Sequence, residues 1–225
     1  MDITHALISE ISTLQHLIAG IAFFVFAAFE IPAALMPKLK IPAIGSFILF
    51  CAGVAGLLLV FDKTGGTPDN LLLAMSKESI FFLFLGLDVL IAVAGLIGIM
   101  QYLSKGMPSF WKIFQMLLFC IIAFVFYTYP RFYGSNAIPV MAQIHRVICY
   151  AIICGAAVSA INVFIKNKII AFVSVFIFFV GGALLVQFKE APESFGNSHV
   201  FRSSMPASPG EVHFEELDKE VKHKK

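Results

Sequence analysis

Long apolar runs separated by short polar breaks make up most of the first 188 residues. Six runs are long enough to cross a bilayer, which takes about 20 mostly apolar residues in a helix. Backbone groups in hydrocarbon must bond internally, and the runs lack the alternation of barrel strands, so we expect helices. The pattern predicts spans at Ile11–Met36, Ala43–Phe61, Ser79–Gln101, Phe110–Tyr129, Ile138–Phe164 and Ile169–Phe188.

The breaks between these runs are short and rich in Pro, Gly and charged residues. One stretch among them, Asp62–Asn70, is predicted to be a solvated loop. Short connections favour antiparallel neighbours in a compact bundle. The chain is therefore predicted to be an all-α polytopic membrane protein with about six transmembrane helices in three antiparallel hairpins. Residues 1–188 would form this bundle. Residues 189–225, rich in Pro, Ser, Glu and Lys, predict a polar, disordered tail.

The composition points the same way. Of the 225 residues, 59% are hydrophobic and only 13% are charged, too few charges for a soluble domain of this size. The net charge of +2 argues against a nucleic-acid partner. The expected partners are the lipid bilayer and, within it, other membrane proteins or further copies of the chain. The Met1-Asp2 start lacks the basic segment of a signal peptide, so we expect the first helix to be retained.

The charges between the runs predict an orientation. Three of the five breaks carry lysines and no acidic residue. The opposite side as a whole mixes both signs, with Lys63, Lys77, Arg131, Lys189, Asp62, Asp69, Glu78 and Glu190. The positive-inside rule then puts these three breaks in the cytoplasm and both termini on the outer or lumenal side. The lysines concerned are Lys38, Lys40, Lys105, Lys112, Lys166 and Lys168.

Four titratable residues fall inside the predicted spans: His16, Glu30, Asp88 and His145. Such side chains are costly in hydrocarbon, so each is a functional hypothesis. His16, Asp88 and His145 lie about two turns into helices that start on the same side, which predicts that they share one layer. Tyr127 and Tyr129, at the end of the fourth span, would reach that layer. Glu30 would lie near the opposite side of the membrane.

Three interpretations of this layer stay open. His16, Asp88 and His145 could bind Zn²⁺ with a water as the fourth ligand. His16 and His145 could ligate a haem. Alternatively the histidines form hydrogen bonds between helices, and Asp88 pairs with His16, His145 or Lys77. The four cysteines lie within apolar runs, and we find no phosphate-binding loop and no catalytic triad. No cofactor and no catalytic residue is therefore assigned.

One stretch of the chain resembles a known family. The fifth span and the turn after it read Ile144-His145, Tyr150-Ala151, Gly155-Ala156 and Val163-Phe164-Ile165-Lys166. This stretch resembles the corresponding helix of the transmembrane protein 45 family, a group of multi-pass eukaryotic membrane proteins. The segments His16–Gly20 and Phe124–Tyr127 are similar to the start of that family's first helix and the end of its fourth.

Other positions depart from that family. Lys77-Glu78 stands where the family has Gln-His, and Tyr129 and Arg131 replace histidines. A Gln-Gly-x-Trp motif is missing around Gly181-Gly182, and a polar tail stands in place of the family's last helix. The resemblance implies a multi-pass protein of the endomembrane system or the plasma membrane, without an established enzyme activity.

Taken together, the sequence favours a non-enzymatic multi-pass membrane protein of structural, trafficking or interaction type. A small-molecule or ion translocator is one alternative, since hairpins of this kind can line a path. An intramembrane metal or haem enzyme that uses His16, Asp88 and His145 is the other.

Overall fold

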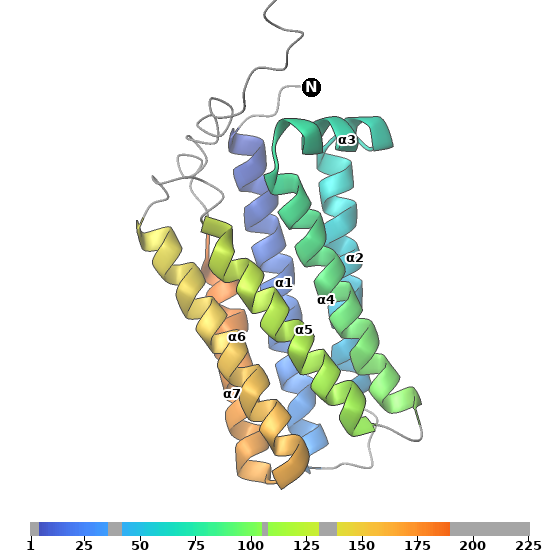
Figure 1. Cartoon of the computed structure of the whole chain (residues 1–225), viewed down its shortest axis with the longest axis vertical. Coiled ribbons are helices and arrows are strands. Elements are labelled where there is room, and N and C mark those ends of the chain that lie inside the picture. The colour runs from blue at the N-terminus through green and yellow to red at the C-terminus, as the bar shows by residue number, and fades with distance from the viewer. Residues whose placement is uncertain (1–4, 36–41, 105–107, 131–138, 190–225) are drawn as a thin grey trace, which may run out of the picture.

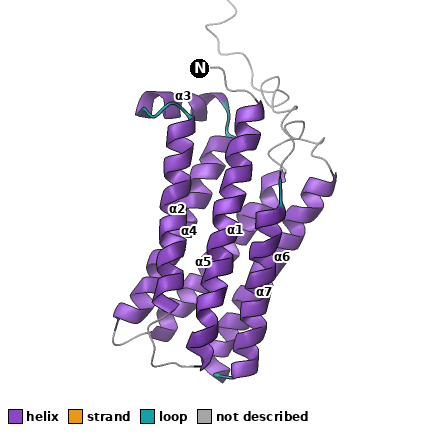
Figure 2. Ribbon diagram, turned by 180° about the vertical axis from the view of Figure 1, so that it is seen from behind, coloured by secondary structure: helices purple, strands orange, loops and turns teal. Residues whose placement is uncertain are grey.

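The computed structural model describes residues 5–35, 42–104, 108–130 and 139–189, and these ranges are helical apart from short turns (Figure 2). Six of the seven helices within these ranges are long and apolar enough to cross a membrane, so the predicted all-α polytopic architecture is confirmed. The exception is the short α3. The helices are α1 (His5–Leu35), α2 (Pro42–Lys63), α3 (Pro68–Lys77), α4 (Ile80–Leu103), α5 (Pro108–Thr128), α6 (Pro139–Ile165) and α7 (Lys168–Gln187).

The six long helices form a closed ring. Each helix packs against the next in the order α1, α2, α4, α5, α6, α7, and α7 packs against α1 to close the ring. Successive helices run in opposite directions, as Figure 1 shows, so the three expected hairpins are α1–α2, α4–α5 and α6–α7. The most extensive contacts, however, lie between hairpins, where α2 meets α4 and α1 meets α7. We call the end where α1, α4 and α6 begin the histidine end, and the opposite end, with Lys112, Lys166 and Lys168, the basic end.

Glycines allow the two most extensive contacts. A methyl group added at Gly53 of α2 would collide with the backbone of Ala92 in α4, and one at Gly95 would collide with α2. Between α1 and α7, a methyl at Gly20 would lie only 2.9 Å from the carbonyl oxygen of Gly182. Small residues of this kind let membrane helices approach closely, because lipid offers no hydrophobic force to drive them together.

The middle of the ring is filled by aromatic side chains. The rings of Phe23 and Phe26 from α1, Phe119 from α5 and Phe178 from α7 are buried, with neighbouring centroids 5.2–6.4 Å apart. We call these four residues the phenylalanine layer. Large apolar side chains on the outer surface are exposed, as lipid contact requires, and examples are Leu58, Phe124 and Phe176.

The structure corrects one prediction at the histidine end. The expected loop at Asp62–Asn70 is shorter, because α2 continues to Lys63 and α3 begins at Pro68. The hydroxyl of Thr67 caps α3 by accepting a hydrogen bond from the backbone N–H of Asn70. Figure 1 shows α3 lying across the end of the bundle. Ala74 packs inward while Leu72 is 63% exposed, an arrangement that suits a helix lying in the membrane interface.

Several sequence-based expectations fall outside the described residues. These concern the polar tail from residue 190 onward and the loop lysines Lys38, Lys40 and Lys105.

Candidate functional site

The two histidines predicted to share a layer lie in direct contact. The imidazoles of His16 in α1 and His145 in α6 have ring centroids 5.5 Å apart and are nearly perpendicular, at 85°. Both side chains are buried. In each ring Nδ1–H donates to a backbone carbonyl one turn earlier, at 2.7 Å to Ser12 and 2.9 Å to Met141. The other ring nitrogen, Nε2, is therefore the acceptor in a neutral imidazole.

Tyr129 completes this group, as its position at the end of the fourth predicted span indicated. Its ring stacks on that of His145, with centroids 5.0 Å apart and 15° between the planes. Its hydroxyl forms a 2.9 Å hydrogen bond with the hydroxyl of Ser12. We call Ser12, Gln15, His16, Tyr129 and His145 the histidine cluster. A cavity of about 10 Å³ lies beside it, room for about one water.

Two polar atoms beside the small cavity are buried without a hydrogen-bond partner among the described residues. They are Nε2 of His16 and Oε1 of Gln15, and both residues line the small cavity. A single water in that cavity is the simplest group that could satisfy them, because a water offers both donors and acceptors.

Asp88 of α4 joins the histidine cluster through Gln15, a residue that the apolar pattern does not single out. Its carboxylate accepts a hydrogen bond from the side-chain amide of Gln15, at 2.5 Å from Nε2 to Oδ2. The expected partners were His16, His145 and Lys77, so this prediction was wrong about the partner. Gln15 precedes His16 in the chain, and helix rotation decides which of the two faces α4. Gly56 of α2 leaves the space that the carboxylate fills.

The geometry bears on the two cofactor hypotheses. No group of three or more His, Cys, Asp and Glu side chains within the described ranges is arranged to hold a metal ion. The carboxylate of Asp88 lies against Gln15 and Gly56 instead of joining the two imidazoles. A haem does not fit between the histidines, because the ring of Phe188 packs against both imidazoles with centroids 5.2 and 5.0 Å away. The third interpretation holds only in part. The two imidazoles join α1 to α6 by ring packing, but their hydrogen bonds run to backbone carbonyls of their own helices, and Asp88 pairs with Gln15.

A second polar site lies at the basic end, inside the ring. Glu30 of α1 and Lys112 of α5 form an ion pair with 3.0 Å between Oε1 and Nζ, and their side chains are only 17% and 11% exposed. The ammonium of Lys112 also lies 5.4 Å from the centroid of the Phe26 ring, within cation–π range. This pair borders a cavity of about 200 Å³ between α1, α5, α6 and α7, which we call the basic-end cavity.

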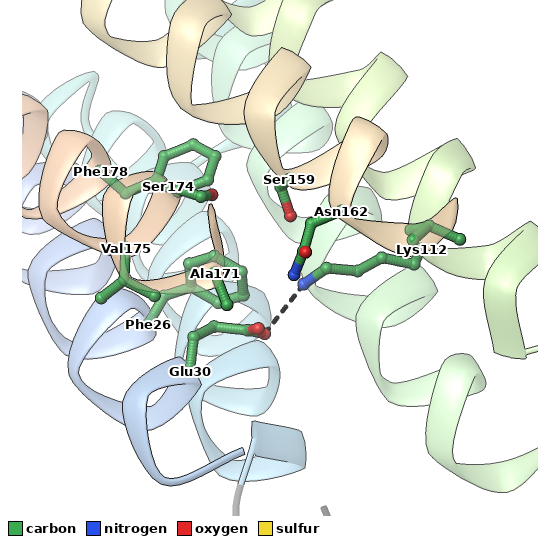
Figure 3. A pocket seen from close by; sticks show the side chains of 10 residues that line it. Phe26, Glu30, Lys112, Ser159, Asn162, Ala171, Ser174, Val175 and Phe178 are labelled. Carbon is green, nitrogen blue, oxygen red and sulfur yellow. Dashed lines mark hydrogen bonds and ion pairs between the residues drawn. The ribbon is translucent and has the colours of Figure 1, made fainter. Parts of the chain in front are cut away.

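Polar groups from α6 and α7 face this ion pair. Figure 3 shows Ser159 and Asn162 on one side of the basic-end cavity, with Ser174 and the ring of Phe178 on another. The hydroxyl of Ser174 donates a 3.0 Å hydrogen bond to the carbonyl of Gly155, and Oδ1 of Asn162 accepts one from the backbone N–H of Asn167. These bonds fix both side chains, so the polar wall of the cavity is preorganised.

The sequence carries a signal for this second site. Lys112 was counted as a loop lysine, although it lies inside the fourth predicted span, Phe110–Tyr129. Glu30 was placed correctly near the side opposite the histidines. An acid and a base inside apolar spans at the same end would have pointed to a buried pair.

A scan of protein-family models and searches of curated proteins and of solved structures find nothing that matches this chain. The resemblance of the fifth span to the transmembrane protein 45 family therefore stays a prediction.

Proposed function

We propose that this protein is a non-enzymatic multi-pass membrane protein that moves a small polar solute through its helical bundle. One observation carries the proposal: two buried polar sites lie at opposite ends of the same ring, with the phenylalanine layer between them. His16 and Glu30 belong to the same helix, and a rise of about 1.5 Å per residue separates them by roughly 21 Å. Polar sites on either side of an apolar barrier are what a translocation path needs.

A role in packing alone accounts less well for the basic-end cavity. Protein interiors are close-packed, whereas the described residues of α1, α5, α6 and α7 leave a partly open cavity of about 200 Å³ that helix packing alone does not require. A buried ion pair can often be replaced by apolar residues without loss of stability. Keeping Glu30 and Lys112 beside an unfilled space therefore favours a binding role.

The same helices serve both polar sites. Among the described residues, α1, α5, α6 and α7 line the basic-end cavity, and α1, α6 and the residue that follows α5 provide the histidine cluster. All six long helices are continuous, unlike the broken helices of many transporters. In this bundle the phenylalanine layer is the barrier. A solute passes when whole helices shift and the rings of the phenylalanine layer move apart.

A swelling assay tests the proposal for several candidate solutes. Liposomes that contain the purified protein are mixed with iso-osmotic glycerol, urea or L-alanine, and light scattering reports solute entering with water. At least one solute should cross several times faster than in protein-free liposomes. Equal rates for every solute would refute translocation.

Two phenylalanines of α5 provide a matched pair of variants. Phe119 lies in the phenylalanine layer and is 0% exposed, whereas Phe124 is 62% exposed on the lipid side. Phe119→Ala should raise the leak of small solutes, because it removes a ring from the barrier. Phe124→Ala should leave the rate unchanged. Equal rates for the two variants would place the path elsewhere.

An interaction role is the second candidate, and α3 favours it. This helix exposes Leu72 and Leu73 at the histidine end, outside the transmembrane ring. Such a surface suits lipid headgroups, another membrane protein or a further copy of the chain. Residence in the endomembrane system or the plasma membrane is part of the same proposal.

A further inference from the structure

We propose that the basic-end cavity binds a small zwitterion, a free amino acid with one ammonium and one carboxylate, as the solute of the proposed translocator. The inference thus rests on the proposed function and names the chemical class of its solute. It starts from the ion pair between Glu30 and Lys112, which borders the cavity and is largely withdrawn from the surface.

Charge complementarity selects the ligand class. The ion pair presents one positive and one negative group to the same cavity (Figure 3). A zwitterion that enters between them lets its carboxylate meet Lys112 and its ammonium meet Glu30, so one ion pair is exchanged for two. The occupied site stays neutral overall. This matters inside a membrane protein, because an added net charge there is costly to desolvate.

Ligands with a single charge fit less well. A lone carboxylate competes for Lys112 and leaves the carboxylate of Glu30 without its partner. A lone ammonium competes for Glu30 and leaves the ammonium of Lys112 without its partner. Removing one member of a buried pair is strongly unfavourable, since the other charge is left uncompensated. The site therefore discriminates against both classes.

The size and the walls of the cavity limit the rest of the ligand. Drug-sized ligands occupy pockets of roughly 300–1,000 Å³, so a cavity of about 200 Å³ admits a smaller molecule. Ser159 and Asn162 offer hydrogen bonds on one side, and Val175 and Phe178 form an apolar wall on another. This combination suits the short side chain of alanine, serine or valine.

The chain contains a natural probe for binding. Trp111 is its only tryptophan and precedes Lys112 on α5. A ligand that changes the surroundings of Lys112 should alter the fluorescence of Trp111. The full chain, in lipid nanodiscs, is titrated with L-alanine, L-serine and L-valine. Propionate, which has only the carboxylate, and L-alaninamide, which has only the ammonium, are titrated in parallel.

The expected result is a saturable change with at least one amino acid and at least tenfold weaker binding of propionate and L-alaninamide. A double variant, Glu30→Gln with Lys112→Gln, removes both charges and leaves neither one unpaired. It should bind the amino acids at least tenfold more weakly. The matched control is Glu10→Gln with Lys63→Gln, which removes the more exposed ion pair at the histidine end and should bind normally.

Three results would overturn the zwitterion site. They are the absence of saturable binding by any of the amino acids, equal binding of a single-charge analogue, and unchanged binding by the Glu30→Gln/Lys112→Gln variant. The swelling assay separates this failure from failure of the proposed function. Faster entry of glycerol or urea without amino-acid binding would refute the zwitterion and leave translocation standing. Saturable amino-acid binding without faster entry of any solute would refute translocation and leave the site standing.

Discussion

Replacing Gly56 by alanine should destabilise the bundle through the side chain of Asp88. A methyl group at Gly56 would overlap three atoms of that side chain, Cγ, Oδ1 and Oδ2. The carboxylate must therefore turn away from α2. Because Oδ2 accepts the hydrogen bond from Gln15, that turn breaks the link between α1 and α4 at the histidine end.

Three contributions set the size of this effect. Leaving buried polar groups unsatisfied costs about 2 kcal/mol. Forcing a methyl group into a packed interior costs about another 2 kcal/mol. The better helix propensity of alanine returns about 1 kcal/mol. The Gly56→Ala variant should therefore lose about 3 kcal/mol of unfolding free energy, most of it carried by the contact with Asp88.

The assay is unfolding by sodium dodecyl sulfate from mixed micelles, followed by helical circular dichroism. Gly86→Ala in α4 is the matched control, because a methyl group there meets nothing within 4 Å. Asp88→Ala removes the three obstructing atoms, so Gly56→Ala should cost much less in that background. The reasoning fails if Gly56→Ala is as mild as Gly86→Ala, or if the costs of Gly56→Ala and Asp88→Ala simply add.

Three further predictions concern the polar layer, the orientation and the tail. Asp88→Asn should be nearly neutral in the same unfolding assay, because the asparagine carbonyl still accepts a hydrogen bond from the Gln15 amide. Asp88→Leu should cost about 1–3 kcal/mol of unfolding free energy, and equal costs for the two variants would contradict this prediction. In a variant without native cysteines, Lys166→Cys should be shielded from an impermeant maleimide in intact cells and Lys63→Cys labelled, and the reverse pattern would invert the predicted orientation. Truncation after Pro192 should leave the unfolding midpoint unchanged, since the composition of the tail predicts no packing role, and a lowered midpoint would show that the tail docks.

The membrane spans were predictable because bilayer thickness sets their length and hydrocarbon leaves helix as the consistent backbone. α3 was missed because a helix of 10 residues is far shorter than a span. Its start signals were nevertheless present in the sequence: Thr67 stands where an N-cap stands, and Pro68 follows it at the first helical position. A search for capping residues would have found a helix that a search for apolar runs cannot.

The sequence predicted how deep in the membrane the candidate site lies, but it did not predict which faces of the helices form it. Position along each helix placed His16 and His145 in one layer, and the structure brings their rings into contact. Which side chain of α1 faces Asp88 depends on helix rotation, and an all-round apolar helix carries little information about it. The role of Gln15 as the partner of Asp88 therefore follows only from the tertiary contacts. The pairing of Glu30 with Lys112 depends on α1 lying across the ring from the start of α5, which no local pattern encodes.

The contact between α2 and α4 lies apart from the basic-end cavity, which α1, α5, α6 and α7 line. Gly53 and Gly95 allow α2 and α4 to approach closely. Helix α2 contributes none of the described residues that line either cavity. The ion pair at the basic end, in contrast, joins α1 to α5 across the cavity. If the bundle moves, the α2–α4 pair is the part best built to stay fixed, because any separation there would open voids beside the glycines. Substitutions that enlarge Gly53 should therefore act on stability, whereas the Glu30→Gln/Lys112→Gln variant should act on solute binding with a smaller effect on stability.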